Sequence, residues 1–197
     1  MLIKNEFEVA APIDKVWAFF GDIPQVATCL PGTELTEDLG GDRYKGQVSI
    51  RMGPVKLQFA GTAHITERDE TAHRIVVDAS GAEAKGRGQA SMVVTATLTK
   101  AKRGAAEAGG GGTKVAVAQD LQLAGAAAQY GRGMIADVSS VLMSDFSRNL
   151  QNRISGNGQA SAAARPAGGI TLGLRAALMA LGRVYRRFFL PYRATAS

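Results

Sequence analysis

Residues 130–154, YGRGMIADVSSVLMSDFSRNLQNRI, decide the fold, because they carry a long helical pattern directly after a series of strand patterns. Their apolar side chains recur at steps of three and four residues: Ile135, Val138, Leu142, Phe146 and Leu150. Most charged side chains of the stretch lie on the opposite face. This spacing predicts an amphipathic helix that buries one face and ends at the small polar run that begins with Ser155.

The chain before this helix consists mainly of strand patterns. Residues 2–10 alternate apolar and charged side chains, and residues 33–123 hold alternating runs separated by turn clusters. Between them, Pro12 opens two short helical patterns that end before Pro31. We therefore predict an α+β fold in which about seven antiparallel strands form a meander between the helix pair and the long helix.

The charge of the chain is distributed unevenly. The net charge is +6, yet the residues after Asp145 include eight arginines and no acidic residue, so residues 1–145 carry 15 basic and 17 acidic groups, a net of 15 − 17 = −2. This asymmetry argues against a nucleic-acid-binding domain and for an anionic partner of the tail, such as a membrane surface. A basic tail that binds RNA is the alternative. The folded domain itself is expected to have little net attraction to anionic lipid.

Few residues offer catalytic or metal-binding chemistry. Cys29 is the single cysteine and the chain has two histidines, so neither a disulfide framework nor a thiolate metal cluster is expected. The sequence contains no HExxH motif, no nucleophile elbow and no suitably spaced pair of acids, and we expect no catalytic residues. The charged N-terminal stretch MLIKNEFEV is unlike a signal peptide, which favours a cytoplasmic location.

The tail combines apolar and basic residues. On a helix, residues 170–192 place aliphatic and aromatic side chains on one broad face and arginines on the other. An arginine in mid-span argues against a membrane-crossing helix, so we predict a helix that lies on the inner face of the cell membrane. A helix packed on its own domain or on a partner protein is the alternative. The expected membrane-binding residues are Leu174, Leu178, Leu181, Arg183, Tyr185, Arg186, Arg187, Phe188 and Phe189.

The composition divides the chain into three parts. Residues 1–155 form the expected ligand-binding domain, and residues 170–192 form the amphipathic helix. Residues 156–169 between them are small and polar, with too little apolar content to fold, and they are expected to act as a flexible linker.

Several motifs resemble one known family. The order of elements resembles the START/Bet v 1-like helix-grip (SRPBCC) superfamily, in which a curved sheet wraps the long helix and leaves an apolar cavity. More closely, residues 1–155 are similar to the G-subunit family of carbon monoxide dehydrogenase. That likeness is carried by FEVAAPIDKVWAFFGD at 7–22, CLPG at 29–32, YKGQVSIRMGPV at 44–55, GGTKV at 111–115, GAAAQYGRGMI at 125–135 and FSRNL at 146–150.

The resemblance implies a cavity between sheet and helix. Its expected walls are Trp17, Phe20, Tyr44, Val48, Phe59, Met92, Val117, Tyr130, Met134, Val138 and Leu142. For each of these side chains, the alternative is an ordinary place in the hydrophobic core.

The resemblance also implies a function. The expected protein is non-catalytic, binds a respiratory quinone (menaquinone or ubiquinone), and links carbon monoxide dehydrogenase, a molybdenum hydroxylase, to the membrane electron-transport chain. The alternatives are a membrane anchor for that enzyme that carries no ligand, and an assembly factor.

Overall fold

The computed structural model describes residues 1–101 and 111–156. The predicted linker lies almost wholly outside the described residues, and the predicted tail helix with its nine membrane-binding residues lies entirely outside them. The described elements follow in the order β1 (Leu2–Val9), α1 (Ile13–Gly21), α2 (Ile23–Cys29), β2 (Thr33–Gly40), β3 (Arg43–Met52), β4 (Val55–Asp69), β5 (Arg74–Glu83), β6 (Gly88–Lys100), β7 (Thr113–Gly125), the short 3-10 helix η1 (Ala126–Gln129) and α3 (Arg132–Ile154).

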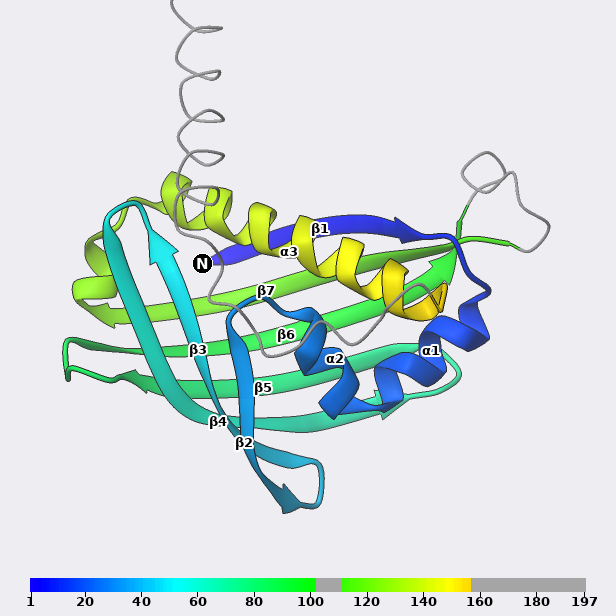
Figure 1. Cartoon of the computed structure of the whole chain (residues 1–197), viewed down its shortest axis with the longest axis horizontal. Coiled ribbons are helices and arrows are strands. Elements are labelled where there is room, and N and C mark those ends of the chain that lie inside the picture. Colours follow the sequence, from blue (N-terminus) through cyan, green and yellow to red (C-terminus); the bar gives the residue numbers. More distant parts are fainter. Residues whose placement is uncertain (102–110, 157–197) are drawn as a thin grey trace, which may run out of the picture.

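The strands form one seven-stranded antiparallel sheet in the order β1-β7-β6-β5-β4-β3-β2. The strands from β2 to β7 follow one another as a meander, and β1 closes on β7 at one edge. The sheet curves around α3, and α1 and α2 cover the end of the sheet that lies nearest the C-terminal end of α3 (Figure 1). This arrangement confirms the predicted α+β fold, with its two short helices after β1 and its long final helix.

Alternation along the strands sets which side chains face α3. On β7 the side chains of Thr113, Val115 and Val117 are buried, whereas their neighbours are half-buried. The pairing register carries this inward face across the sheet, so that Val117 lies opposite Ala96 on β6, and Ala96 lies opposite Ile75 on β5. A sheet with one buried and one exposed face follows from this period of two.

Two apolar clusters hold α3 on the sheet. The larger cluster joins α1, α2 and the C-terminal half of α3, where Phe146 packs edge-on against Phe7 and Phe20. The smaller cluster lies at the other end of the sheet and joins the β3–β4 hairpin to η1 and the first half of α3. Its buried members are Leu57, Phe59, Ala127 and Val138.

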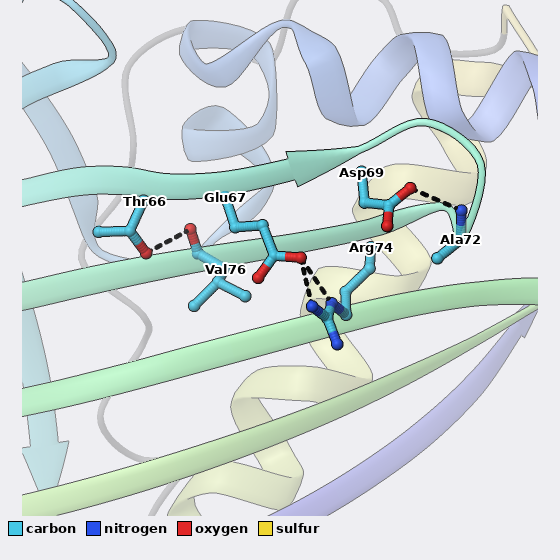
Figure 2. A network of polar contacts seen from close by, with 6 residues as sticks. All are labelled: Thr66, Glu67, Asp69, Ala72, Arg74 and Val76. Atoms are coloured by element: carbon cyan, nitrogen blue, oxygen red, sulfur yellow. Dashed lines mark hydrogen bonds and ion pairs between the residues drawn. The ribbon is translucent and has the colours of Figure 1, made fainter.

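The β4–β5 hairpin carries paired charges on its outer side (Figure 2). Arg74 forms an ion pair with Glu67, and its Nε donates to Glu67 Oε1 over 3.0 Å. Asp69 Oδ1 accepts a hydrogen bond of 2.8 Å from the Ala72 amide and closes the turn. The charges of Glu67 and Arg74 are therefore matched locally.

The connection between β5 and β6 differs from the sequence-based expectation. The glycines from Gly81 to Gly88 predict a loose connection or a bulged strand start, but β5 continues through Gly81 to Glu83, and only residues 84–87 form the turn. Because glycine is also common in turns, a glycine inside a strand can be mistaken for the end of that strand. Gly81 instead lies where two strands approach each other closely.

Candidate functional site

The candidate site is the part of the concave sheet face that lies between the two apolar clusters. Inward-facing residues there are half-buried and belong to neither cluster: Ala63 on β4, Ala79 on β5, Met92 on β6 and Leu121 on β7. They form one continuous row, since the register pairs Ala63 with Ala79, Ala79 with Met92, and Met92 with Leu121. We call this row and the side chains next to it the central floor.

A row of glycines runs beside the central floor. Gly46, Gly61 and Gly81 lie opposite one another on β3, β4 and β5. A Cβ added to Gly61 would lie 1.9 Å from the backbone oxygen of Ser80 and 2.5 Å from Cα of Gly81. Only glycine permits so close an approach of two strands. The glycine row therefore allows the sheet to bend, and it leaves the concave face without side chains along this line.

A polar network reaches the central floor from β7. Gln119 is 8% exposed and takes the inward position between Val117 and Leu121. Its Oε1 accepts a hydrogen bond of 3.1 Å from Ser139 Oγ on α3, and Ser139 Oγ accepts one of 3.2 Å from Asn5 Nδ2 on β1. These bonds hold the carboxamide of Gln119 in one orientation.

The same network leaves one donor unused. Within residues 1–101 and 111–156, Gln119 Nε2 donates to no other group. No fully buried side-chain nitrogen or oxygen in this part of the chain lacks a partner, so Nε2 is not fully buried. An amide donor fixed at the side of an otherwise apolar floor suits a ligand that is mostly apolar and carries an acceptor oxygen.

A second polar group lies at the end of the sheet near η1. Glu83 pairs in register with the inward-facing Phe59, and its side chain is only 3% exposed. Its carboxylate accepts hydrogen bonds from the backbone amides of Lys85 and Arg87 at 2.9 and 3.3 Å, and it forms an ion pair with the Arg87 guanidinium at 2.8 Å. The hydrogen bonds from Arg87, above all, lower the pKa of Glu83 from 4.5 to about 2. This carboxylate is therefore charged at neutral pH and already has its partners.

The eleven predicted cavity residues divide between the clusters. Trp17, Phe20, Tyr44 and Val117 belong to the larger cluster, whereas Val48, Phe59, Tyr130, Val138 and Leu142 belong to the smaller one. Met92 lies on the central floor, and Met134, near the start of α3, is 48% exposed. The proposed cavity walls stay a prediction, in which Met92 is the member that faces the space between the clusters.

The aromatic members of the larger cluster have specific neighbours. Trp17 packs edge-on against His73, with their ring centres 5.3 Å apart. Burial raises the pKa of the Tyr44 hydroxyl, and the nearby carboxylates of Asp38 and Asp42 raise it further. Tyr44 therefore remains a neutral hydroxyl at physiological pH.

Two hollows are found at other places on the described surface. One of about 540 Å³ lies over β4 to β7, and most of its lining side chains point away from α3, including Thr62, Ser80 and Ser91. The other, of about 320 Å³, lies between β1 and the serine-bearing face of α3. None of the eleven predicted cavity residues lines either hollow.

The described residues contain no group of three or more His, Cys, Asp or Glu side chains that could hold a metal ion. Cys29 is buried, and burial raises the pKa of its thiol. None of the helices in residues 1–101 and 111–156 is long and apolar enough to cross a membrane.

Reasoning from the sequence missed Gln119 and Glu83. A signal for Gln119 is present, because it is a polar residue at an inward position of a strand whose other inward positions are mostly apolar. Glu83 could not be assigned in this way, because its orientation depends on the extension of β5 through Gly81.

Solved structures with a similar fold identify the architecture of the domain. A conserved protein from Geobacillus kaustophilus matches with a TM-score of 0.68 at 21% identity, over 81% of this chain and 98% of that one. The Zhui aromatase/cyclase from Streptomyces sp. R1128 matches with a TM-score of 0.52 at 14% identity, over 82% and 98%. At such identities the likeness concerns the fold alone. The chain has the Bet v 1-like helix-grip fold, in which a curved antiparallel sheet holds one long helix.

The particular family follows from the sequence of the same domain. The model of the family described as the G subunit of carbon monoxide dehydrogenase (CoxG) matches residues 6–155, and the chain belongs to this family. No protein with a curated description matches it by sequence. The family name associates the chain with carbon monoxide dehydrogenase.

Proposed function

We propose that this protein is a non-catalytic carrier that binds a respiratory quinone on the central floor and presents it to carbon monoxide dehydrogenase. The observation that carries the proposal is the Gln119 amide, whose Nε2 is unused beside the apolar floor residues. A quinone combines a long apolar tail with ring carbonyls that accept hydrogen bonds. The floor fits the apolar part, and Nε2 fits one carbonyl oxygen.

The family supports the choice of partner. A dehydrogenase in water must pass its electrons to an acceptor that is dissolved in the bilayer, and a protein that holds the acceptor between floor and helix connects the two phases. The tail, residues 170–192, would keep the carrier at the inner face of the cell membrane through its arginines and apolar side chains. Menaquinone and ubiquinone both carry the required carbonyls.

The test fills the floor and leaves the tail intact. Ala79 faces inward and is half-buried, so Ala79→Leu extends a side chain into the space between the clusters. Ala82 lies on the same strand, faces outward and is exposed, so Ala82→Leu is the matched control. In vesicles that contain quinone, we expect Ala79→Leu to abolish the coupling of carbon monoxide oxidation to quinone reduction, and Ala82→Leu to preserve it.

The outcome also separates the carrier from a simple membrane anchor. An anchor would recruit the dehydrogenase regardless of the floor, so preserved coupling in a folded, membrane-bound Ala79→Leu variant would contradict the carrier proposal. Unfolding in urea, measured for both variants, confirms that loss of coupling does not come from loss of the fold.

A further inference from the structure

One end of the domain concentrates basic residues. The segments 51–56, 83–87 and 126–134 carry Arg51, Lys56, Lys85, Arg87 and Arg132, and Glu83 is their one acidic residue. Their net charge is therefore 5 − 1 = +4, whereas residues 1–145 as a whole carry −2. All five basic residues are exposed. We call these segments the basic end.

The three segments lie next to one another in the fold. Arg51 and Lys56 face each other across the β3–β4 hairpin. The β5–β6 turn joins β4 through a 2.7 Å hydrogen bond from the Ala84 amide to the Gln58 carbonyl oxygen, and it joins η1 through one of 2.7 Å from the Ala126 amide to the Arg87 carbonyl oxygen. Figure 1 shows the hairpin, this turn and the start of α3 at the same end of the molecule.

The positive charges are poorly compensated within the domain. Two like charges directly opposite on neighbouring strands repel each other, as Arg51 and Lys56 do. Arg132 is the first residue of α3, whose first turn contains no acidic residue, and a cation there opposes the helix dipole. None of Arg51, Lys56, Lys85 and Arg132 forms an ion pair with another described residue.

Two basic residues at the opposite end have acidic partners. Arg68 pairs with Asp42 at 3.3 Å, and Arg74 pairs with Glu67 (Figure 2). The accumulation at the basic end is a local feature, because its segments carry a net charge of +4 whereas residues 1–145 as a whole carry −2. Charges that oppose the fold without a partner inside it are expected at functional surfaces.

An exposed apolar side chain lies within the same patch. Met134 is 48% exposed and follows Arg132 by two residues on α3. It lies one turn before Val138, a buried member of the smaller cluster. Exposed apolar and basic side chains at one end of a molecule are the composition of surfaces that bind at a lipid interface.

We infer that the basic end docks directly on an anionic phospholipid bilayer, with Met134 inserted among the headgroups. This inference rests on the proposed carrier function, because docking in this orientation brings the start of α3 and the neighbouring end of the sheet to the lipid from which the ligand comes. The expectation that the domain has little net attraction to anionic lipid rested on its net charge alone. That net charge is small, but the segments of the basic end carry +4.

The experiment places a fluorescent probe at the basic end of the full-length chain. Met134→Trp introduces an indole at an exposed position, and the native Trp17 in the unaltered protein reports the other end. The vesicles contain brominated phosphatidylcholine with or without phosphatidylglycerol, because bromine quenches an indole that enters the bilayer. We expect strong quenching of the introduced indole only on vesicles with phosphatidylglycerol, and little quenching of Trp17.

Two sets of substitutions in the Met134→Trp variant test whether the basic residues cause the quenching. Arg51→Gln, Lys56→Gln, Lys85→Gln and Arg132→Gln together remove the uncompensated charges. The matched control removes four exposed basic residues elsewhere that have no ion pair with a described residue, by Lys4→Gln, Lys15→Gln, Arg43→Gln and Lys100→Gln. At low salt each basic residue near the surface contributes roughly fivefold in affinity. The first set is expected to abolish the quenching and the second to retain it.

The docking inference is wrong if the two sets show equal quenching. It is also wrong if the chain binds the vesicles and the introduced indole is not quenched. Quinone uptake, measured on the same samples, tests the carrier function separately. Uptake without quenching would contradict the orientation and leave the carrier intact. Quenching without uptake would contradict the carrier function on which the inference rests.

Discussion

Glu83 Oε1 lies 2.8 Å from Arg87 Nη2 across the turn between β5 and β6, and this ion pair joins the inner face of the sheet to its surface. The Glu83 side chain is 3% exposed, whereas that of Arg87 is 40% exposed. The Arg87 carbonyl oxygen in turn accepts from the first residue of η1. The pair thus holds the β5–β6 turn, to which the start of η1 is hydrogen-bonded.

Stability in acid should depend on this pair. The folded-state pKa of Glu83 is about 2, below its ordinary value of 4.5. Its contribution to the free energy of unfolding is therefore complete above pH 4.5 and decreases as the pH falls towards 2. Glu83→Gln should lower stability at pH 7 and flatten the dependence between these values. Urea unfolding at a series of pH values measures both effects, and parallel curves for the two proteins would contradict this role.

The bend of the sheet should depend on Gly61. A Cβ there would lie 1.9 Å from the Ser80 carbonyl oxygen, so Gly61→Ala forces β4 and β5 apart. We expect a loss of at least 1–3 kcal/mol, roughly the cost of overpacking a core. Gly133→Ala is the control, because a Cβ at this exposed helical position meets no atom within 4 Å. It should raise the free energy of unfolding by about 0.5–1 kcal/mol. Equal effects of the two substitutions would show that the close strand contact has no energetic weight.

The network behind Gln119 should be sensitive to one hydroxyl. Ser139 Oγ donates to Gln119 and accepts from Asn5, so Ser139→Ala leaves two amide groups without their partner. The expected loss is about 1–3 kcal/mol by thermal or urea unfolding. Ser144 is exposed on the same helix, and Ser144→Ala should change stability by less than about 0.5 kcal/mol. If Ser139→Ala lowers the free energy of unfolding no more than Ser144→Ala does, the hydrogen bonds of Ser139 do not stabilise the fold.

The framework of the fold could be predicted from the sequence because its patterns are local. The steps of three and four residues from Ile135 to Leu150 define α3, and the alternation along residues 113–123 defines β7. The site is less accessible to such reasoning. Gln119 becomes informative only when its register to β1 and its distance from Ser139 are known.

The clustering of basic residues at one end of the fold could not be predicted from the sequence either. Arg51 and Lys85 belong to different hairpins, and nothing in their spacing shows that both lie near Arg132. A sum over residues 1–145 cancels these charges against acids that lie elsewhere. The tail prediction depends on residues outside the described part of the chain and stays a prediction.

The most direct test of the carrier proposal measures transfer of a quinone to the protein. Lipid-free full-length protein is incubated with liposomes that contain menaquinone, separated from them, and extracted for mass spectrometry. A parallel incubation uses an isoprenoid hydrocarbon with the same tail and no carbonyls. Gln119→Met removes the amide donor and keeps a side chain of similar length.

We expect the wild-type protein to take up menaquinone, and Gln119→Met to bind it roughly fivefold more weakly, as the loss of about 1 kcal/mol for one hydrogen bond requires. Binding of the hydrocarbon should be unchanged by the substitution. If the wild-type protein takes up no menaquinone, the carrier proposal is wrong. If Gln119→Met weakens both ligands equally, Gln119 does not recognise the carbonyl.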